Sequence, residues 1–599
     1  MNKTLSIFLA AAFSCCAAGP SKKISGDLAH VPPQSTVRVI VQWHHGADAT
    51  AEQSIQNAGG AVVSKFKAVH GGVYTVPASG LEQIASDPAV KYISLDRPLK
   101  TNLDNSTAAV NVAAAWQAGF TGSGIGVAVI DSGINSDPNL GSKKNPVVFS
   151  YDFTDPEAAA VASAALSRIS GPVDLSYLPL KSMSANDQFG HGQHVAGIIA
   201  ARPQGPKCRN CTREFSGMAP GVSLIDLKVL DKNGEGTDSN AILAIETAIA
   251  LKNVYNIRVI NLSLGRPVYE SYRQDPLCQA VEAAWKAGIV VVVAAGNDGR
   301  DNTYGQQGYG TINAPGNDPY VITVGAMKTE GTYTRADDLI ASYSSKGPTQ
   351  VDHVVKPDLV APGNLVVSLL AAGSTLPKNY PQNSVYTSYY QDIHDRGARS
   401  NTYFTLSGTS MAAPVVSGAA ADLLQANPSL TPDQVKALLM QTAYKSFPQS
   451  SAVTDLASGI TYTAYYDIFT VGAGYLDVAA ALNLVNSVPA TGTALSPMAN
   501  YNPMTGEVTI SLDPTSIWVN QSLFGNRSMW GVNSVWDSSV LRGNRCMWGV
   551  STTTSADRSM WGVSTTTSAD RSMWGVNSVY SSSSTDTAAS SGVAITGEQ

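Results

Sequence analysis

Residues 126–133 read Gly-Val-Ala-Val-Ile-Asp-Ser-Gly, an uninterrupted run of small and apolar residues that ends in an acidic residue and a turn. A run without alternation is typical of a strand in a parallel sheet that is covered on both faces. Comparable runs, separated by helical patterns, occur at residues 222–225, 259–262 and 290–295. This repeated strand–helix order predicts an α/β domain with a mostly parallel sheet.

The first of these strands brings Asp131 to its carboxyl end, which is the edge where parallel sheets carry their functional crevice. Asn297 follows another predicted strand in the same way. Aspartate is also a common turn residue. Asp131 alone therefore does not distinguish a catalytic role from a structural one.

Two histidines, His191 and His194, lie in the segment Gly-His-Gly-Gln-His-Val-Ala-Gly at residues 190–197. The glycines beside His191 allow other backbone to approach closely, and the residues after it predict a tightly packed helix. A metal site would need a third ligand or a His-Glu-x-x-His pattern, which this segment lacks. We therefore assign a catalytic role to His191 and a structural role to His194.

Ser410 opens an Ala- and Gly-rich helical pattern within Gly-Thr-Ser-Met-Ala-Ala-Pro at residues 408–414. Serine at a helix start is ordinarily a cap. The same position also gives a hydroxyl beside unpaired N–H groups at the positive end of the helix, where an oxyanion is stabilised. The amide of Asn297 is a candidate for a second donor to that oxyanion.

The segments that carry these side chains resemble, in chain order, the signature blocks of the subtilisin family (subtilases, peptidase family S8). These segments are residues 131–133, 191–197, 294–297 and 408–414. The order Asp, His, Ser is the subtilisin order. Further matching blocks lie at residues 217–221, 261–265, 344–348 and 356–363. The resemblance covers residues 103–487, and one departure from it is Gln193, where the family usually has threonine.

The resemblance implies a three-layer subtilisin-like fold and a serine endopeptidase of broad specificity. Ser410 is expected to attack the peptide carbonyl, His191 to act as the base, and Asp131 to orient the imidazole. Asn297 and the Ser410 N–H are expected to hold the oxyanion. Substrate is expected to lie as an added strand between two segments. These segments are Ser263, Leu264 and Gly265 on one side, and Gly234, Glu235 and Gly236 on the other.

Other classes of protein fit the sequence poorly. An α/β-hydrolase lipase needs Gly-x-Ser-x-Gly and the chain order Ser, Asp, His, but Ala412 stands where the last glycine would be. A net charge of −6 gives no basic surface for nucleic acid. We expect no required cofactor and assign no metal site. Structural calcium, common in the family, stays open, although no Asp-x-Asp-x-Asp-Gly loop is visible.

The amino terminus, residues 1–18, has the layout of a secretory signal peptide, with a lysine, a short apolar stretch and small residues at the end. It predicts a secreted protein; the alternative is a lipoprotein anchored through Cys15 or Cys16. In an exported protein, Cys208 and Cys211 predict a small local disulfide, with a zinc or redox site as the alternatives.

Residues 19–102 are predicted to form a separate unit. The pattern between residues 35 and 98 is strand-helix-strand-strand-helix-strand, which indicates a small α+β, ferredoxin-like module. This unit resembles the inhibitor I9-type prodomain of the family. The resemblance implies that this unit is an intramolecular inhibitor of the rest of the protein. It also implies that the protein matures by self-cleavage between Pro98 and Asn105.

The carboxyl-terminal part has a different composition. Residues 488–517 are rich in Pro, Thr, Ser and Asn and predict a linker. Residues 518–599 contain repeated Trp-Gly pairs, at Trp530, Trp548, Trp561 and Trp574. The repeats predict either a stacked core or a disordered tail with aromatic residues. Such a tail is a candidate binder of a cell surface or an insoluble substrate, and the alternative function is an adhesin on a subtilase scaffold.

Overall fold

The computed structural model describes most of the chain outside the amino terminus and the repeat region. The described residues are 23–26, 28, 31–45, 49–66, 69–96, 98–101, 108–140, 146–167, 181–202, 215–301, 308–332, 334–391, 397–455, 458–487, 492–502, 507–513, 515–517 and 597–598. The predicted signal peptide, Cys208, Cys211 and the tryptophan repeats lie outside them and stay predictions. Among the described residues, none of the helices has the length and apolar character that a membrane crossing requires.

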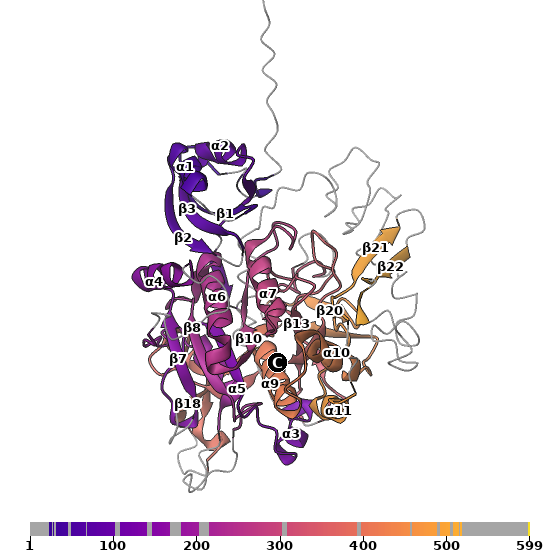
Figure 1. Cartoon of the computed structure of the whole chain (residues 1–599). Coiled ribbons are helices and arrows are strands. Elements are labelled where there is room, and N and C mark those ends of the chain that lie inside the picture. Colours follow the sequence, from indigo (N-terminus) through magenta and orange to yellow (C-terminus); the bar gives the residue numbers. More distant parts are fainter. Residues whose placement is uncertain are drawn as a thin grey trace, which may run out of the picture.

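The amino-terminal unit is a small antiparallel sheet with two helices (Figure 1). Its elements are β1 (Thr36–Trp43), α1 (Ala49–Asn57), β2 (Ala61–Phe66), β3 (Gly71–Pro77), α2 (Leu81–Ala85) and β4 (Val90–Leu95). The strands pair in the order β2-β3-β1-β4, and each pair is antiparallel. Trp43, Tyr74 and Ile93 belong to a core of its own. The chain order of strands and helices is the one expected from the sequence.

The larger domain, which the resemblance predicts to be catalytic and which we call the catalytic domain, is built on an eight-stranded sheet in the order β14-β13-β12-β10-β6-β8-β7, with β15 beside β13. Only the β13–β14 pair is antiparallel. The strands are β6 (Gly126–Asp131), β7 (Val147–Asp152), β8 (Ser223–Lys228), β10 (Ile257–Leu262), β12 (Val290–Ala294), β13 (Ile322–Lys328), β14 (Leu339–Ile340) and β15 (Leu359–Pro362). The predicted mostly parallel α/β sheet is confirmed.

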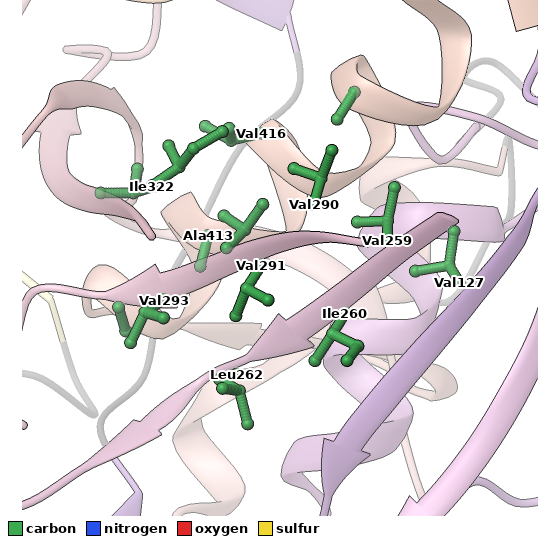
Figure 2. Packing of buried hydrophobic residues seen from close by; sticks show 14 of the residues in the cluster. Val127, Val259, Ile260, Leu262, Val290, Val291, Val293, Ile322, Ala413 and Val416 are labelled. Atoms are coloured by element: carbon green, nitrogen blue, oxygen red, sulfur yellow. The ribbon is translucent and has the colours of Figure 1, made fainter. Parts of the chain in front are cut away.

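Both faces of this sheet are covered, because every residue of β6, β12 and β13 is buried. One pair of helices, α5 (His191–Ala200) and α9 (Thr409–Ala426), packs together and against the sheet. A second pair is α6 (Asp238–Tyr255) and α7 (Pro276–Lys286). Figure 2 shows Val416 of α9 among valines and isoleucines of the central strands. Burial of these apolar side chains is the main favourable contribution to folding.

The remaining elements lie around this core. The helices are α3 (Ala113–Gln117), α4 (Pro156–Ser167), α8 (Thr375–Asn379), α10 (Pro432–Thr442) and α11 (Val478–Asn483), with short 3₁₀ turns at Ala78–Gly80, Ala108–Val110, Pro138–Leu140, Pro381–Asn383 and Thr387–Tyr389. Three small sheets are formed by β16 (Val366–Leu369), β17 (Ser384–Tyr386) and β18 (Arg399–Leu406), by β19 (Ser450–Thr454) and β20 (Thr461–Tyr465), and by β21 (Met498–Asn502) and β22 (Glu507–Ser511). A further three-stranded sheet joins β5 (Pro98–Thr101) to β9 (Glu235–Thr237) and β11 (Leu264–Gly265).

Part of the stretch expected to be a linker is folded onto the catalytic domain. Ser496 donates a hydrogen bond from its hydroxyl to Asp358 Oδ1 at 2.6 Å and accepts one from Lys436 Nζ at 2.8 Å. Ala494 and Ile517 are buried in the main core. The described residues between 492 and 517 therefore extend the catalytic domain instead of separating it from the repeat region.

The amino-terminal unit contacts the catalytic domain through polar groups. The Asp96 carboxylate accepts hydrogen bonds from the backbone N–H and the hydroxyl of Ser239, at 2.9 and 2.8 Å, in the first turn of α6. An anion at the amino end of a helix is stabilised by the helix dipole. Lys65 pairs its backbone N–H and C=O with the Ser163 hydroxyl of α4 at 2.8 and 3.0 Å. Asp96 thus contacts α6 two residues before β5 begins at Pro98.

Candidate active site

Asp131 and His191 form a buried pair at the carboxyl edge of the sheet. Asp131 is the last residue of β6, and His191 is the first residue of α5. His191 Nδ1 lies 2.6 Å from Asp131 Oδ1, and both residues are at most 1% exposed. The chain before the helix turns at Gly190 with φ +110°, a conformation that favours glycine.

Asp187 fixes the start of α5 and was not singled out by the sequence patterns. Its carboxylate accepts hydrogen bonds from the N–H groups of Gly190 at 2.7 Å and Gln193 at 2.9 Å. It also accepts the Ser132 hydroxyl at 2.9 Å, and that hydroxyl accepts the N–H of Gly192 at 2.8 Å. Burial raises the pKa of Asp187 to about 6. An acidic residue four positions before a helix-opening histidine is the signal that could have pointed to this role.

Ser410 is held against the carboxyl end of β10, the strand that pairs with β6. Its hydroxyl donates to the backbone C=O of Ser263 at 3.1 Å, and the Ser263 hydroxyl donates to the Ser410 C=O at 2.6 Å. Leu262 pairs with Ile130 between β10 and β6. The next residues, Ser263 and Asp131, are therefore level with each other, so Ser410 lies at the same edge of the sheet as Asp131.

Asn297 has its two side-chain ends in different environments. Asn297 Oδ1 accepts hydrogen bonds from the Thr409 N–H at 2.9 Å and the Thr409 hydroxyl at 3.1 Å. Asn297 Nδ2 is buried and has no hydrogen-bond partner among the residues that the structure describes. A buried N–H without a partner costs free energy, so this donor is available for an acceptor that arrives with a substrate.

The two segments expected to hold substrate flank a strand of the chain itself. Residues 98–101 run as β5 between β9 and β11, antiparallel to both. Lys100 is paired with Gly265 on one side and with Glu235 on the other. Leu264 and Gly236 also lie in these pairing strands. The space between β9 and β11, which we call the slot, therefore accepts an extended peptide, here β5, through backbone pairing.

Two of the six expected wall residues lie just outside the paired strands. Gly234 is in the turn before β9, at φ +76°, and Ser263 immediately precedes β11. Ser263 instead holds Ser410 through the two hydrogen bonds between them. Position 236 requires glycine, because a Cβ there would lie 2.4 Å from the Val229 carbonyl oxygen.

His194 and Gln193 have structural partners. His194 Nε2 is 3.0 Å from the Phe404 carbonyl oxygen, and burial lowers the pKa of His194 to about 3. Gln193 Oε1 accepts the N–H of Asn135 at 2.8 Å. Within the described parts of the chain, no group of three or more His, Cys, Asp or Glu side chains is arranged to hold a metal ion.

Comparison with known proteins identifies the family. Residues 122–465, more than half of the chain, match the sequence model of the Subtilase family, Peptidase_S8. The chain belongs to the subtilase family. Serine protease AprX of Bacillus subtilis is 34% identical to this subtilase over 418 residues, which is 67% of this chain and 81% of AprX. Subtilisin E of Bacillus subtilis is 30% identical over 400 residues, which is 66% of this chain and 81% of subtilisin E.

A solved structure supports the fold of this subtilase. The crystal structure of fervidolysin from Fervidobacterium pennivorans, a keratinolytic enzyme related to subtilisin, matches with a TM-score of 0.50 and 21% identity. The match covers 77% of this chain and 62% of fervidolysin. The predicted family, fold class and enzyme class are thus confirmed, and this subtilase is a subtilisin-like serine protease. The adhesin alternative finds no support among these relatives.

Proposed function

We propose that this subtilase is a secreted endopeptidase that hydrolyses protein substrates through Ser410, His191 and Asp131. The observation that carries the proposal is the buried pair of His191 and Asp131, 2.6 Å apart, at the sheet edge to which Ser410 also belongs. The Asp131 carboxylate accepts a hydrogen bond from Nδ1 of His191, which then carries the proton. The other imidazole nitrogen, Nε2, is then the base that takes the Ser410 proton.

The first chemical step is attack of Ser410 Oγ on the peptide carbonyl as its proton moves to His191 Nε2. The negative charge that develops on the carbonyl oxygen accepts hydrogen bonds from Asn297 Nδ2 and from the Ser410 N–H, a first-turn group that a helix leaves unpaired. His191 then returns the proton to the leaving amine, and an acyl group remains on Ser410. Water, activated by His191, releases the acid and restores the hydroxyl.

Substrate binding is proposed to use the slot between β9 and β11. An extended peptide that enters it becomes the middle strand of a three-stranded sheet, as β5 does. Pairing of this kind recognises the peptide backbone and leaves the side chains of the peptide to subsidiary pockets. Broad specificity follows, and protein substrates need to be locally extended to enter.

The amino-terminal unit is proposed to be the enzyme's own inhibitor. Support comes from β5, which fills the slot, and from Asp96, which is bonded to the first turn of α6 two residues before β5 begins. Maturation would then remove residues 19–102 by self-cleavage between Pro98 and Asn105. We expect the amino terminus of the secreted wild type to lie in that interval, and the Ser410→Ala protein made in a protease-free host to keep the unit. Identical trimming of both proteins would rule out self-cleavage.

Export is proposed to use residues 1–18 as a signal peptide, and the Trp-Gly repeats are proposed to bind a cell surface or an insoluble substrate.

The proposed proteolytic activity is tested with casein as the substrate. We expect the mature wild type to release soluble peptides and the Ser410→Ala and His191→Ala proteins to release almost none. Ser123→Ala, which changes an exposed serine of the catalytic domain, should keep most of the activity. Equal activity in the wild type and the Ser410→Ala protein would refute the proposed nucleophile.

A further inference from the structure

The residues Gly597 and Glu598, near the end of the chain, contact the catalytic domain. Glu598 is only 4% exposed. Its Oε1 accepts hydrogen bonds from Arg300 Nη2 at 2.8 Å and from the Ser342 N–H at 3.0 Å, and also from the Ser342 hydroxyl. Its other oxygen, Oε2, is 3.8 Å from Lys328 Nζ. A buried carboxylate thus meets two cations and two neutral donors.

The backbone of Glu598 is recognised as well as its side chain. Asn364 Oδ1 accepts the Glu598 N–H at 3.0 Å, and Asn364 Nδ2 donates to the Glu598 C=O at 3.0 Å. One amide side chain therefore pairs with both polar groups of a single peptide residue, as a neighbouring strand would. Such pairing fixes the direction in which the peptide lies.

The residue before Glu598 is restricted to glycine. Gly597 has φ +80°, and a Cβ at this position would lie 2.3 Å from Leu365 Cδ2 and 2.4 Å from the Ser407 hydroxyl oxygen. A side chain here would have to displace the exposed Leu365 side chain and the buried Ser407 hydroxyl, and it would be strained at this positive φ in any case. The site therefore favours a Gly-Glu pair, with glycine favoured by the backbone conformation and glutamate by the surrounding donors.

Each of the two cations of the site faces Glu598 and one other carboxylate. Arg300 Nη1 is paired with Asp455 at 2.7 Å, and its Nη2 faces Glu598. Lys328 is 5% exposed and is otherwise paired with Glu330 at 3.3 Å. Removing Glu598 would leave Arg300 Nη2 and the Ser342 N–H buried without this acceptor, which is unfavourable. The pocket therefore offers buried donors, Arg300 Nη2 and the Ser342 N–H, to a carboxylate.

We propose that this pocket is a receptor for the acidic carboxyl-terminal Gly-Glu segment of the chain, which binds it non-covalently. Ile517 is anchored in the same domain, where its N–H donates to the Thr493 C=O at 2.9 Å. The segment between residues 517 and 597, which carries the Trp-Gly repeats, is thus attached to the catalytic domain at both ends. A cut within this segment would leave the carboxyl-terminal fragment bound.

The test uses a Ser410→Ala chain that ends at residue 590, with a fluorescent peptide of residues 591–599 as the probe. We expect saturable binding, measured by fluorescence anisotropy, and much weaker binding to the full-length chain, whose pocket is filled. Glu598→Gln and Gly597→Val peptides should bind at least about tenfold more weakly, because the first removes the charge that Arg300 faces and the second adds a side chain at a strained backbone position. No binding by the folded shortened chain, or equal binding of the three peptides, would overturn the proposal.

A second measurement uses the full-length Ser410→Ala protein, so that the proposal stays testable if the shortened chain does not fold. The Glu598→Gln protein should unfold at a temperature several degrees lower than its parent, while Glu157→Gln, which changes an exposed glutamate of α4, should not differ. A Glu598→Gln protein as stable as the Glu157→Gln control would contradict the docking of this segment.

Discussion

Asn297 turns its side-chain oxygen toward Thr409, 2.9 Å from the backbone nitrogen, and leaves its amide nitrogen buried without a partner among the described residues. Thr409 directly precedes Ser410, so one hydrogen bond sets both the orientation of the amide and its place beside the proposed nucleophile. The arrangement keeps a donor ready before any substrate arrives. Preorganised donors stabilise developing charge because they need no rearrangement during the reaction.

Replacing Asn297 with leucine should lower kcat by about 10²–10³ with little change in KM, since one oxyanion donor is lost and the substrate strand is not touched. Steady-state kinetics on a chromogenic peptide measures both constants. Asn500→Leu, in the β21–β22 hairpin, is a suitable control. A variant with a raised KM and an unchanged kcat would place Asn297 in ground-state binding instead.

Replacing Gly236 with valine should weaken substrate binding. A Cβ at this position would lie 2.4 Å from the Val229 carbonyl oxygen, so β9 would have to move out of its place beside the slot. We expect KM for an extended peptide to rise by about tenfold or more, because the lost backbone pairing stabilises the bound peptide. Thr463→Val, at an exposed position of β20 that stays in the mature enzyme, is the control. An unchanged KM would exclude β9 as a wall of the binding slot.

Replacing Lys436 with methionine should destabilise the fold. Lys436 Nζ is buried, 3.1 Å from Asp358 Oδ1, and donates to the carbonyl oxygen of Pro319 at 2.8 Å. Removing one partner of a buried ion pair costs about 3–5 kcal/mol. Urea unfolding of the Ser410→Ala protein measures the loss, with the surface substitution Lys232→Met as the control. A loss below about 1 kcal/mol would mean that Lys356 alone is sufficient for Asp358.

The free energy of unfolding should decrease as the pH decreases, because of His194. Its pKa is about 3 in the folded protein and near 6.5 when unfolded, so between these values the unfolded chain binds the extra proton. The contribution is complete above about pH 6.5 and is lost as the pH falls toward 3, with a slope of up to about 1.4 kcal/mol per pH unit. Urea unfolding at pH 4, 5 and 6 compares the Ser410→Ala protein with the same protein carrying His194→Gln. The free energy of unfolding should change less with pH in the His194→Gln protein. Equal slopes would show that His194 does not contribute.

The sequence predicted the sheet well because its strands are buried on both faces. The apolar run that ends at Asp131 and the one that precedes Asn297 became β6 and β12. Asp131 also came together with His191, as the resemblance implied. The strand predictions succeeded because the pattern of apolar residues is a local property of the chain.

Other features depend on contacts between distant segments and leave little local signal. Asp187 acts through backbone groups that only the folded turn brings to it. Residues 488–517 were predicted to be a linker because they are rich in Pro, Thr, Ser and Asn, yet Ala494 and Ile517 reach the core. Glu598 lies far along the chain from Arg300, and no pattern in the sequence links the two.

The most direct test of the central claim is covalent labelling of the mature enzyme with a serine-directed fluorophosphonate, followed by peptide mapping and a casein assay. We predict one adduct on Ser410, complete loss of casein hydrolysis at full labelling, and little labelling of the His191→Ala protein, because the hydroxyl reacts only when the imidazole takes its proton. Full casein hydrolysis by the labelled enzyme, or an adduct on another residue with Ser410 unmodified, would contradict the proposed mechanism.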